Sequence, residues 1–131
     1  MKILGIDYGE KRIGLAVSDE TMTLARELDI LSPKEFWNEI KSIINDNQIA
    51  KIVIGWPLNM SGGMTEKTKE VERFKLKVGR ESGLPVEVID ERLSSVMAES
   101  ISGQKKDLDS LAAQILLQNY LDREKGLGVR G

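Results

Sequence analysis

The sequence predicts a single α/β domain in which a β-hairpin is followed by strand–helix–strand crossovers. A short β-branched run at residues 51–55 follows an amphipathic helical segment, an order that is typical of a right-handed crossover onto a parallel strand. The length of 131 residues suits one domain with its own hydrophobic core. We therefore treat residues 1–131 as one domain.

The composition restricts the chemistry that the chain can perform. With 40% hydrophobic and 31% charged residues, it is typical of a soluble globular protein. The chain contains no cysteine and no histidine, which excludes disulfides, thiolate metal sites and imidazole bases. Any hydrolytic chemistry must therefore use carboxylates.

Charge and hydropathy indicate where the protein acts. No apolar run approaches the ~20 residues that cross a bilayer, so we expect a cytoplasmic protein without membrane partners. The net charge is −2. A nucleic-acid partner would therefore need a local basic patch and a bound cation.

The first half of the chain predicts three strands and a helix. The first strand has two mostly apolar faces and ends in Asp7, and Gly9 is placed for a positive φ in the turn that follows. The helix begins at Ser32, with Pro33 in the first helical position and Glu35 completing a capping box. The predicted strands occupy residues 3–7 and 13–18 and part of 24–31.

The second half alternates strands and helices and ends in a tail. A glycine-containing loop at 56–64 leaves the carboxyl end of one strand, where ligand sites are common in α/β sheets. The predicted elements are strands at 51–55 and 86–89, helices at 65–82, from Ser94 or Ser95 to Gly103, and at 108–123, and a mobile tail at 126–131.

One face of the predicted helix 65–82 carries a basic residue at each successive turn. Glutamates are interspersed with these residues, which favours an ordinary solvated surface. A nucleic-acid contact is the alternative. The four residues are Lys69, Arg73, Lys77 and Arg80.

Carboxylates follow two of the predicted parallel strands and open the final helix. Asp7 ends the first strand, and Asp90 and Glu91 follow the last one, so they can meet at one edge of the sheet. Asp109 lies in the first turn of the final helix, on a stripe that it shares with small apolar residues such as Ala113. Three acids so close together favour a hard divalent cation, Mg²⁺ or Mn²⁺, and phosphodiester hydrolysis.

Each acid also has a structural interpretation. Asp7 can accept hydrogen bonds from its own turn, Glu91 can form an ion pair with Arg92, and Asp109 can extend a helix cap. Asp19 and the residue after it are interpreted as turn residues.

Four ordered motifs resemble those of the YqgF family, whose members are described as Holliday junction resolvases and as pre-16S rRNA nucleases. The resemblance extends from the first strand to the final helix. Its motifs are Gly5-Ile-Asp-Tyr-Gly9 with Arg12-Ile-Gly-Leu-Ala-Val-Ser-Asp19, Gly55-Trp-Pro-Leu-Asn59 with Gly62, Asp90-Glu-Arg-Leu-Ser94 with Ala98-Glu99, and Asp109-Ser-Leu-Ala-Ala113 with Ile115-Leu-Leu-Gln-Asn-Tyr-Leu-Asp122.

The resemblance implies an RNase H-like fold, in which three antiparallel strands and two further parallel strands form one mixed sheet. It implies that Asp7, Glu91 and Asp109 are the catalytic acids and bind a divalent metal. The segment before Asp109 is shorter and less basic here than is usual for the family, which predicts an altered substrate groove. Arg12, Asn59 and Arg92 occupy motif positions beside the acids and are predicted to contact the substrate phosphates. Lys105 and Lys106, in the shortened segment, are the other candidate phosphate contacts.

The sequence therefore predicts a metal-dependent endonuclease, monomeric or homodimeric, for 5′-end maturation of precursor 16S rRNA or for resolution of branched DNA. One alternative is a non-catalytic RNA- or ribosome-binding module of the same fold. A nucleotide-phosphate enzyme is a third hypothesis, because Asp7-Tyr-Gly9 resembles a phosphate-binding turn, but such enzymes use two domains.

Overall fold

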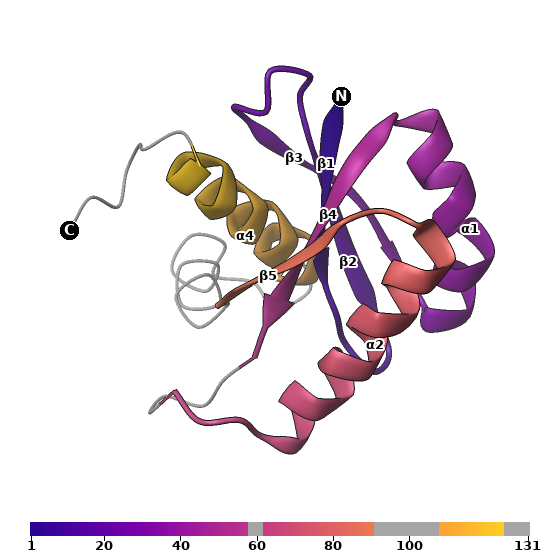
Figure 1. Ribbon diagram of the computed structural model, residues 1–131, viewed down its shortest axis with the longest axis vertical. Coiled ribbons are helices and arrows are strands. Elements are labelled where there is room, and N and C mark those ends of the chain that lie inside the picture. The colour runs from indigo at the N-terminus through magenta and orange to yellow at the C-terminus, as the bar shows by residue number, and fades with distance from the viewer. Residues whose placement is uncertain (58–61, 91–107, 125–131) are drawn as a thin grey trace.

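The computed structural model describes residues 1–57, 62–90 and 108–124, which form a mixed five-stranded sheet with helices on both faces (Figure 1). The sheet order is β3-β2-β1-β4-β5. The strands are β1 (Lys2–Asp7), β2 (Ile13–Ser18), β3 (Ala25–Leu31), β4 (Ile49–Trp56) and β5 (Val86–Asp90). The helices are α1 (Pro33–Asp46), α2 (Glu66–Ser82) and α4 (Leu108–Glu124).

The pairing of the strands confirms the predicted topology. β1 lies in the middle of the sheet, antiparallel to β2 and parallel to β4. β3 is antiparallel to β2, and β5 is parallel to β4. β4 is longer than the predicted run at 51–55, because Ile49 pairs with Lys2 and Trp56 pairs with Asp90.

The two faces of the sheet bury separate cores. Figure 1 shows α1 and α2 on one side of the sheet and α4 on the other. Leu4 and Ile6 of β1 pack with Phe36 of α1 and Phe74 of α2. Ile3, on the opposite side of the same strand, packs in the core under α4. This alternation explains why both faces of β1 are apolar.

Helix α1 begins as the sequence predicts. The Glu35 amide donates to the Ser32 hydroxyl (3.2 Å), and the Ser32 amide donates to the Glu35 carboxylate (2.8 Å), so the capping box is complete. Pro33 occupies the first helical position. At the end of α2, Gly83 has a φ of 70°, the left-handed conformation that favours glycine.

Gly9 serves a different purpose from the predicted one. It is not among the glycines with positive φ in the described part of the chain. A Cβ at this position would instead lie 2.5 Å from the Arg12 carbonyl oxygen. The prediction of a positive φ was wrong, and the turn between β1 and β2 needs glycine because two backbone segments approach closely.

Asp19 is a turn residue, as predicted. Its carboxylate accepts hydrogen bonds from the Thr23 amide (2.8 Å), the Leu24 amide (3.2 Å) and the Thr21 hydroxyl (2.9 Å). These bonds close the connection between β2 and β3. Asp19 therefore has a structural role in the connection between β2 and β3.

Helix α4 lies unusually close to β1. A Cβ built on Gly5 would be 2.8 Å from the Cβ of Leu117, a separation that real Cβ atoms essentially never show. Gln118 also binds β3, accepting from the Ala25 amide at 2.8 Å. Glycine at position 5 is therefore required for α4 to rest on the sheet.

Two predictions concern segments outside the described residues: the short helix that begins at Ser94 or Ser95, and the mobile tail at 126–131. In the described part of the chain, no helix has the length and apolar character needed to cross a membrane.

Replacing Gly5 by alanine is expected to lower the free energy of unfolding by about 1–3 kcal/mol, because the added methyl group overpacks the contact with Leu117. Gly79→Ala in α2 is the matched control, since its Cβ would lie 3.8 Å from the Val86 side chain. There alanine should stabilise the helix by about 0.5–1 kcal/mol. Urea denaturation measures both changes, and an unchanged stability of Gly5→Ala would contradict the close packing.

The hydrogen bonds at Asp19 predict a pH-dependent contribution to stability. The Thr23 amide, followed by the Leu24 amide, lowers the pKa of Asp19, so its contribution is complete above the unfolded-state pKa of about 3.9 and is lost as the pH falls through the folded-state pKa. Asp19→Ala is expected to be less stable than the unmutated protein at pH 7, and the difference should narrow below about pH 4. Urea unfolding across pH, with Glu20→Ala as the charge control, tests this, and a pH-independent difference would refute it.

Candidate active site

The central strand β1 ends in Asp7, whose side chain is partly exposed. Side chains alternate along a strand, so Ile3, Gly5 and Asp7 lie on the same face. Ile3 belongs to the core under α4, and Gly5 faces Leu117 of α4. Asp7 therefore lies at the carboxyl edge of the sheet, on the face that α4 covers.

Strand β5 ends at the same edge in a second acid. β1, β4 and β5 are mutually parallel, and Trp56 at the end of β4 pairs with Asp90. Asp90 is exposed, while Ile89 before it is buried in the core under α4. Glu91, the predicted catalytic acid, lies outside the described residues.

Helix α4 runs in the opposite direction to β1. Leu121, near the end of the helix, lines a cavity of about 340 Å³ together with Ile3, near the start of β1. Tyr120 contacts Lys51, near the start of β4. The carboxyl half of α4 therefore lies at the edge where the parallel strands begin, and its amino end points toward the edge where they finish.

Asp109 is the second residue of α4. Measured along the helix axis, Asp109 lies about 12 Å before Leu117. Measured along the strand, Asp7 lies about 7 Å beyond Gly5. Both residues thus lie on the same side of the Gly5–Leu117 contact, toward the carboxyl edge of the sheet. Ala113, predicted to share the packed stripe, is fully buried. The Asp109 side chain lies outside the described part of the structure.

The far end of α4 is fixed by a polar cluster. The Lys51 ammonium group lies 2.6 Å from the Glu87 carboxylate and donates to the Tyr120 hydroxyl at 2.9 Å. The hydrogen bond to Glu87, followed by that to Tyr120, raises the pKa of Lys51. Lys51 therefore remains a cation and joins β4, β5 and α4 at the edge opposite Asp7.

Among the predicted substrate-binding residues, Arg12 falls within the described part of the chain. It is exposed in the turn between β1 and β2, close in sequence to Asp7. Four predicted contacts lie outside the described residues, namely Asn59, Arg92, Lys105 and Lys106.

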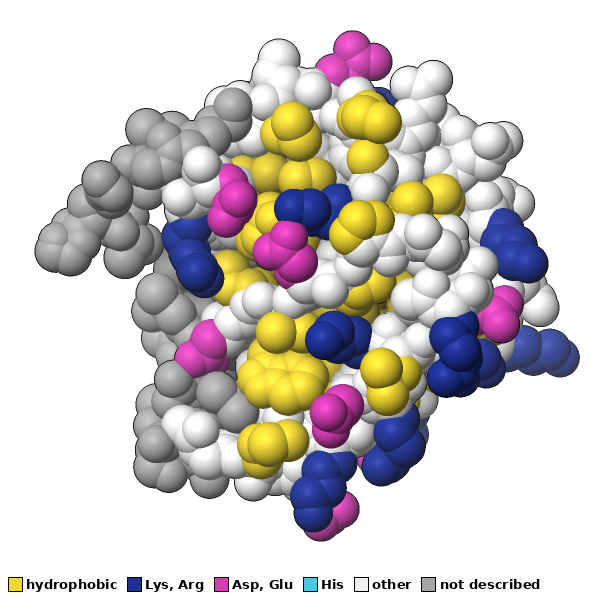
Figure 2. All heavy atoms as spheres, viewed as in Figure 1, with side chains coloured by type: hydrophobic (Ala, Val, Ile, Leu, Met, Phe, Trp, Pro, Cys, Tyr) yellow, Lys and Arg dark blue, Asp and Glu magenta, His cyan; other side chains and the backbone are white. Residues whose placement is uncertain are grey.

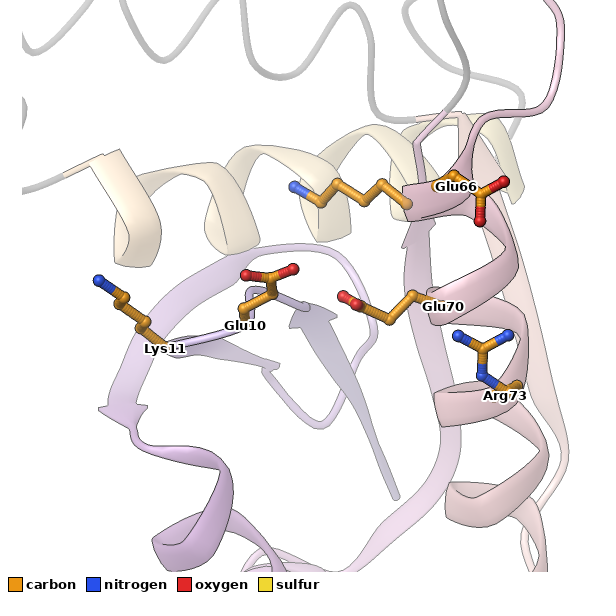
Figure 3. Close-up of a pocket in the computed structure, with 6 residues that line it drawn as sticks. Glu10, Lys11, Glu66, Glu70 and Arg73 are labelled. Atoms are coloured by element: carbon orange, nitrogen blue, oxygen red, sulfur yellow. The ribbon is translucent and has the colours of Figure 1, made fainter.

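A cleft of about 460 Å³ opens between the β1–β2 turn and the first half of α2 (Figure 3). Figure 3 shows Glu10 and Glu70 extending into it from opposite sides. Three acidic and three basic side chains line the opening, so the cleft carries both charges. Its lining residues are Glu10, Lys11, Glu66, Lys67, Glu70 and Arg73.

Tyr8 connects this cleft to the end of β1. Its ring packs on Phe74 of α2 with a centroid distance of 4.5 Å, and its hydroxyl group bonds to the Glu70 side chain. Burial, followed by the negative charges of Glu70 and Glu10, raises the pKa of Tyr8. Tyr8 therefore stays a neutral phenol and attaches the strand end to α2.

No pattern in the sequence predicted a role for Tyr8, Glu10 or Glu70. Phe74 lies at helical spacing from the apolar residues Val71 and Val78, and Tyr8 directly follows the candidate acid. These two features were the sequence signals that pointed to a contact at Tyr8. No local pattern in the sequence indicates that the β1–β2 turn and α2 face each other.

The Asp7 carboxylate at this edge is a donor of the type that binds hard cations. Asp7 supplies a partly exposed carboxylate at a strand end, and a chain without histidine or cysteine offers mainly oxygen donors, which suit Mg²⁺ or Mn²⁺. Within residues 1–57, 62–90 and 108–124, no group of three potential ligands is arranged to hold a metal ion. Of the three predicted ligands, Asp7 is the one whose side chain falls within the described residues.

Similar solved structures confirm the RNase H-like fold. The structure of Thermus thermophilus RuvC in complex with Holliday junction substrate aligns over 96% of each chain with a TM-score of 0.60 at 18% identity. The fowlpox virus resolvase, in complex with substrate Holliday junction DNA, aligns over 95% of this chain and 99% of its own with a TM-score of 0.55 at 16% identity. At such identities the likeness concerns the fold alone.

Relatives at higher identity carry a different name. A protein of Thermoanaerobacter pseudethanolicus named "Putative pre-16S rRNA nuclease" is 36% identical over 95% of this chain and 99% of its own length. One of the same name from Desulfitobacterium hafniense (strain DSM 10664 / DCB-2) is 38% identical over 93% of this chain and 92% of its own. The family model described as "RuvX: Holliday junction resolvase" matches residues 1–123. The chain therefore belongs to the RuvX family of nucleases, which confirms the resemblance predicted from its motifs.

Proposed function

We propose that the protein is a metal-dependent endonuclease in which Asp7, Glu91 and Asp109 bind the catalytic metal. The observation that carries this proposal is the antiparallel course of α4 over β1. It brings the backbone of Asp109 toward the edge and face of the sheet where Asp7 ends its strand.

Glu91 is included because of the motif to which it belongs. Ile89 is buried in the core under α4, and Asp90, the last residue of β5, is exposed on the other side of the strand. Asp90 therefore does not share the α4 face with Asp7. The resemblance of the Asp90-Glu-Arg92 motif assigns the second ligand to Glu91 instead.

The protein's own acids would hold Mg²⁺ or Mn²⁺ through oxygen atoms. When bound, such an ion activates water for attack and stabilises the leaving oxygen of a phosphodiester. The carboxylates hold the metal at the sheet edge, and the neutral Tyr8 keeps the Asp7 strand end attached to α2. Neither imidazole nor thiolate chemistry is needed, in agreement with the composition.

Basic and amide side chains would hold the nucleic-acid strand beside these acids. Arg12 is exposed in the turn next to Asp7 and can offer a bidentate contact to phosphate. We assign the same task to four further residues on the basis of their motif or charge: Asn59, Arg92, Lys105 and Lys106.

Among substrates, we favour precursor 16S rRNA, cleaved during maturation of its 5′ end in the cytoplasm. The relatives named for this substrate are 36–38% identical to the chain over nearly its full length, whereas the junction-bound structures are 16–18% identical. Branched DNA is the second candidate. Junction resolution needs two sites related by a two-fold axis and thus a homodimer, whereas single cleavage of RNA needs only a monomer.

Metal binding has a readout that does not depend on turnover. A ligand that binds only the folded state raises its stability, by about 2.7 kcal/mol at a hundred times its Kd. Mn²⁺ or Mg²⁺ is expected to raise the melting temperature of the unmutated protein and to have much less effect on Asp7→Asn. Asp46→Asn, an exposed acid at the end of α1, is the control and should respond as the unmutated protein does. Equal metal responses of all three proteins would exclude Asp7 as a ligand.

Cleavage tests the reaction and its substrate together. Unmutated protein, Asp7→Asn and Glu91→Gln are incubated with precursor 16S rRNA, single-stranded RNA and a four-way DNA junction, with Mn²⁺, Mg²⁺ or a chelator. We expect the unmutated protein to cleave the precursor, and both variants and the chelator to reduce the rate by at least about a hundredfold. Metal-independent cleavage, or equal rates for all proteins, would refute the mechanism. Binding without any cleavage would support the non-catalytic alternative.

A further inference from the structure

We propose that α2 is a docking track for the phosphate backbone of a duplex arm of the substrate. The proposal deepens the proposed function and rests on it, because the duplex would flank the site of cleavage. The track is formed by Lys69, Arg73, Lys77 and Arg80 and is called the α2 stripe below.

The α2 stripe faces away from the protein core. Its four residues are exposed, whereas Val71, Phe74 and Val78 on the opposite side of the helix are buried. Lys69 and Arg80 are about 16 Å apart along the helix axis. Phosphates recur about every 3.4 Å of axis on each strand of a duplex, so the stripe can pass several of them.

The stripe begins beside the candidate active site. α2 follows β4, whose end lies at the carboxyl edge of the sheet together with the ends of β1 and β5. Tyr8, the residue after Asp7, contacts Phe74 and Glu70 in the first half of α2. A nucleic acid with its scissile bond at Asp7 would therefore meet the start of α2 before its end.

The charge of α2 contrasts with that of the whole protein. Six Lys or Arg and four Glu give the helix a formal charge of +2, although the chain carries −2. Figure 2 shows Lys and Arg side chains along the lower right of the molecule, over α2, with a few acidic side chains among them. Glu66 lies 3.5 Å from Lys69, but this pair is highly exposed and such pairs contribute little.

The surroundings of the stripe suit a polyanion. The Lys77 ammonium group lies 4.2 Å from the centroid of the Trp37 ring, which limits the conformations of that lysine before any ligand binds. Arg73 lines the cleft that opens toward the β1–β2 turn. Cations at successive helical turns match a repeating phosphate backbone better than a single acidic side chain of a protein partner.

Salt-dependent binding tests the track without cleavage. Binding to hairpins with a single-stranded 5′ extension, one of RNA and one of DNA, is measured by fluorescence anisotropy in chelator over a range of KCl concentrations. Lys69→Gln/Arg80→Gln is expected to weaken binding by about tenfold or more near 0.1 M salt and to reduce the slope of log K against log salt by about 2. These two residues avoid the Tyr8 and Trp37 contacts, so the fold should be retained.

Arg26→Gln/Arg123→Gln is the matched control, since both arginines are exposed and lie on β3 and α4. Its slope of log K against log salt should be nearly that of the unmutated protein. A second pair of hairpins with very short stems should show a smaller difference between Lys69→Gln/Arg80→Gln and the unmutated protein, because a short duplex would not extend as far as Arg80. Loss of affinity for both RNA and DNA stems would show that the shared backbone is recognised, and loss for one alone would identify that duplex form.

The outcomes separate this inference from the proposed function. If the unmutated protein cleaves with metal but both double variants have its slope of log K against log salt, the docking track is wrong and the proposed nuclease activity is supported. If the α2 variant loses binding but the unmutated protein cleaves none of the substrates, the track is supported and the nuclease is wrong. Light scattering compares the molar mass of Lys69→Gln/Arg80→Gln with that of the unmutated protein. If the molar mass differs but the slope of log K against log salt does not, α2 is an interface between protein molecules and the proposal is overturned.

Discussion

The close packing of α4 against β1 is the constraint on which the rest of the structure depends. Leu117 rests where a side chain at position 5 would otherwise project, so the helix can approach the middle of the sheet. The contact fixes the distance of α4 from the sheet, and the cluster of Lys51, Glu87 and Tyr120 fixes its far end. Together they determine the direction in which the helix points its first turn.

This direction gives the central strand two different tasks at its end. Consecutive residues of a strand face opposite sides, so Asp7 lies on the α4 face while Tyr8 reaches the α2 face. Asp7 and the amino end of α4 lie toward one side, and the cationic surface proposed for duplex binding begins on the other. β1 lies between them, with hydrogen-bonded strands on both sides, and is well supported against displacement.

Local rules made much of the fold predictable from sequence. Ser32, Pro33 and Glu35 identify the start of α1 because a helix cap involves only residues a few positions apart. The alternation of strands and helices predicted the parallel crossovers, and the motif resemblance predicted the mixed five-stranded sheet and the family. The acids Asp7 and Asp109 were recognised from their places at a strand end and a helix start, and the backbone course of the two elements agrees with those places.

Features that depend on distances between separate segments were not predictable in the same way. Gly9 was expected to need a positive φ, but it is required by the approach of the Arg12 carbonyl oxygen. The Tyr8–Glu70 bond and the cleft beside it join a turn to a helix about sixty residues away. Helix and strand propensities and hydrophobic periodicity depend on residues close together in the sequence, so they do not predict contacts between distant segments.

The order of the elements along the chain has a consequence for synthesis of the protein. α4 follows all five strands of the described sheet, yet it covers the face formed by Ile3, Ala16 and Val53. Until this helix emerges from the ribosome, that face has no α4 to cover it, and Asp109 is not yet available to the proposed metal site. A nascent chain therefore cannot assemble the proposed centre, so a nuclease directed at ribosomal RNA would be inactive while its own ribosome is still making it.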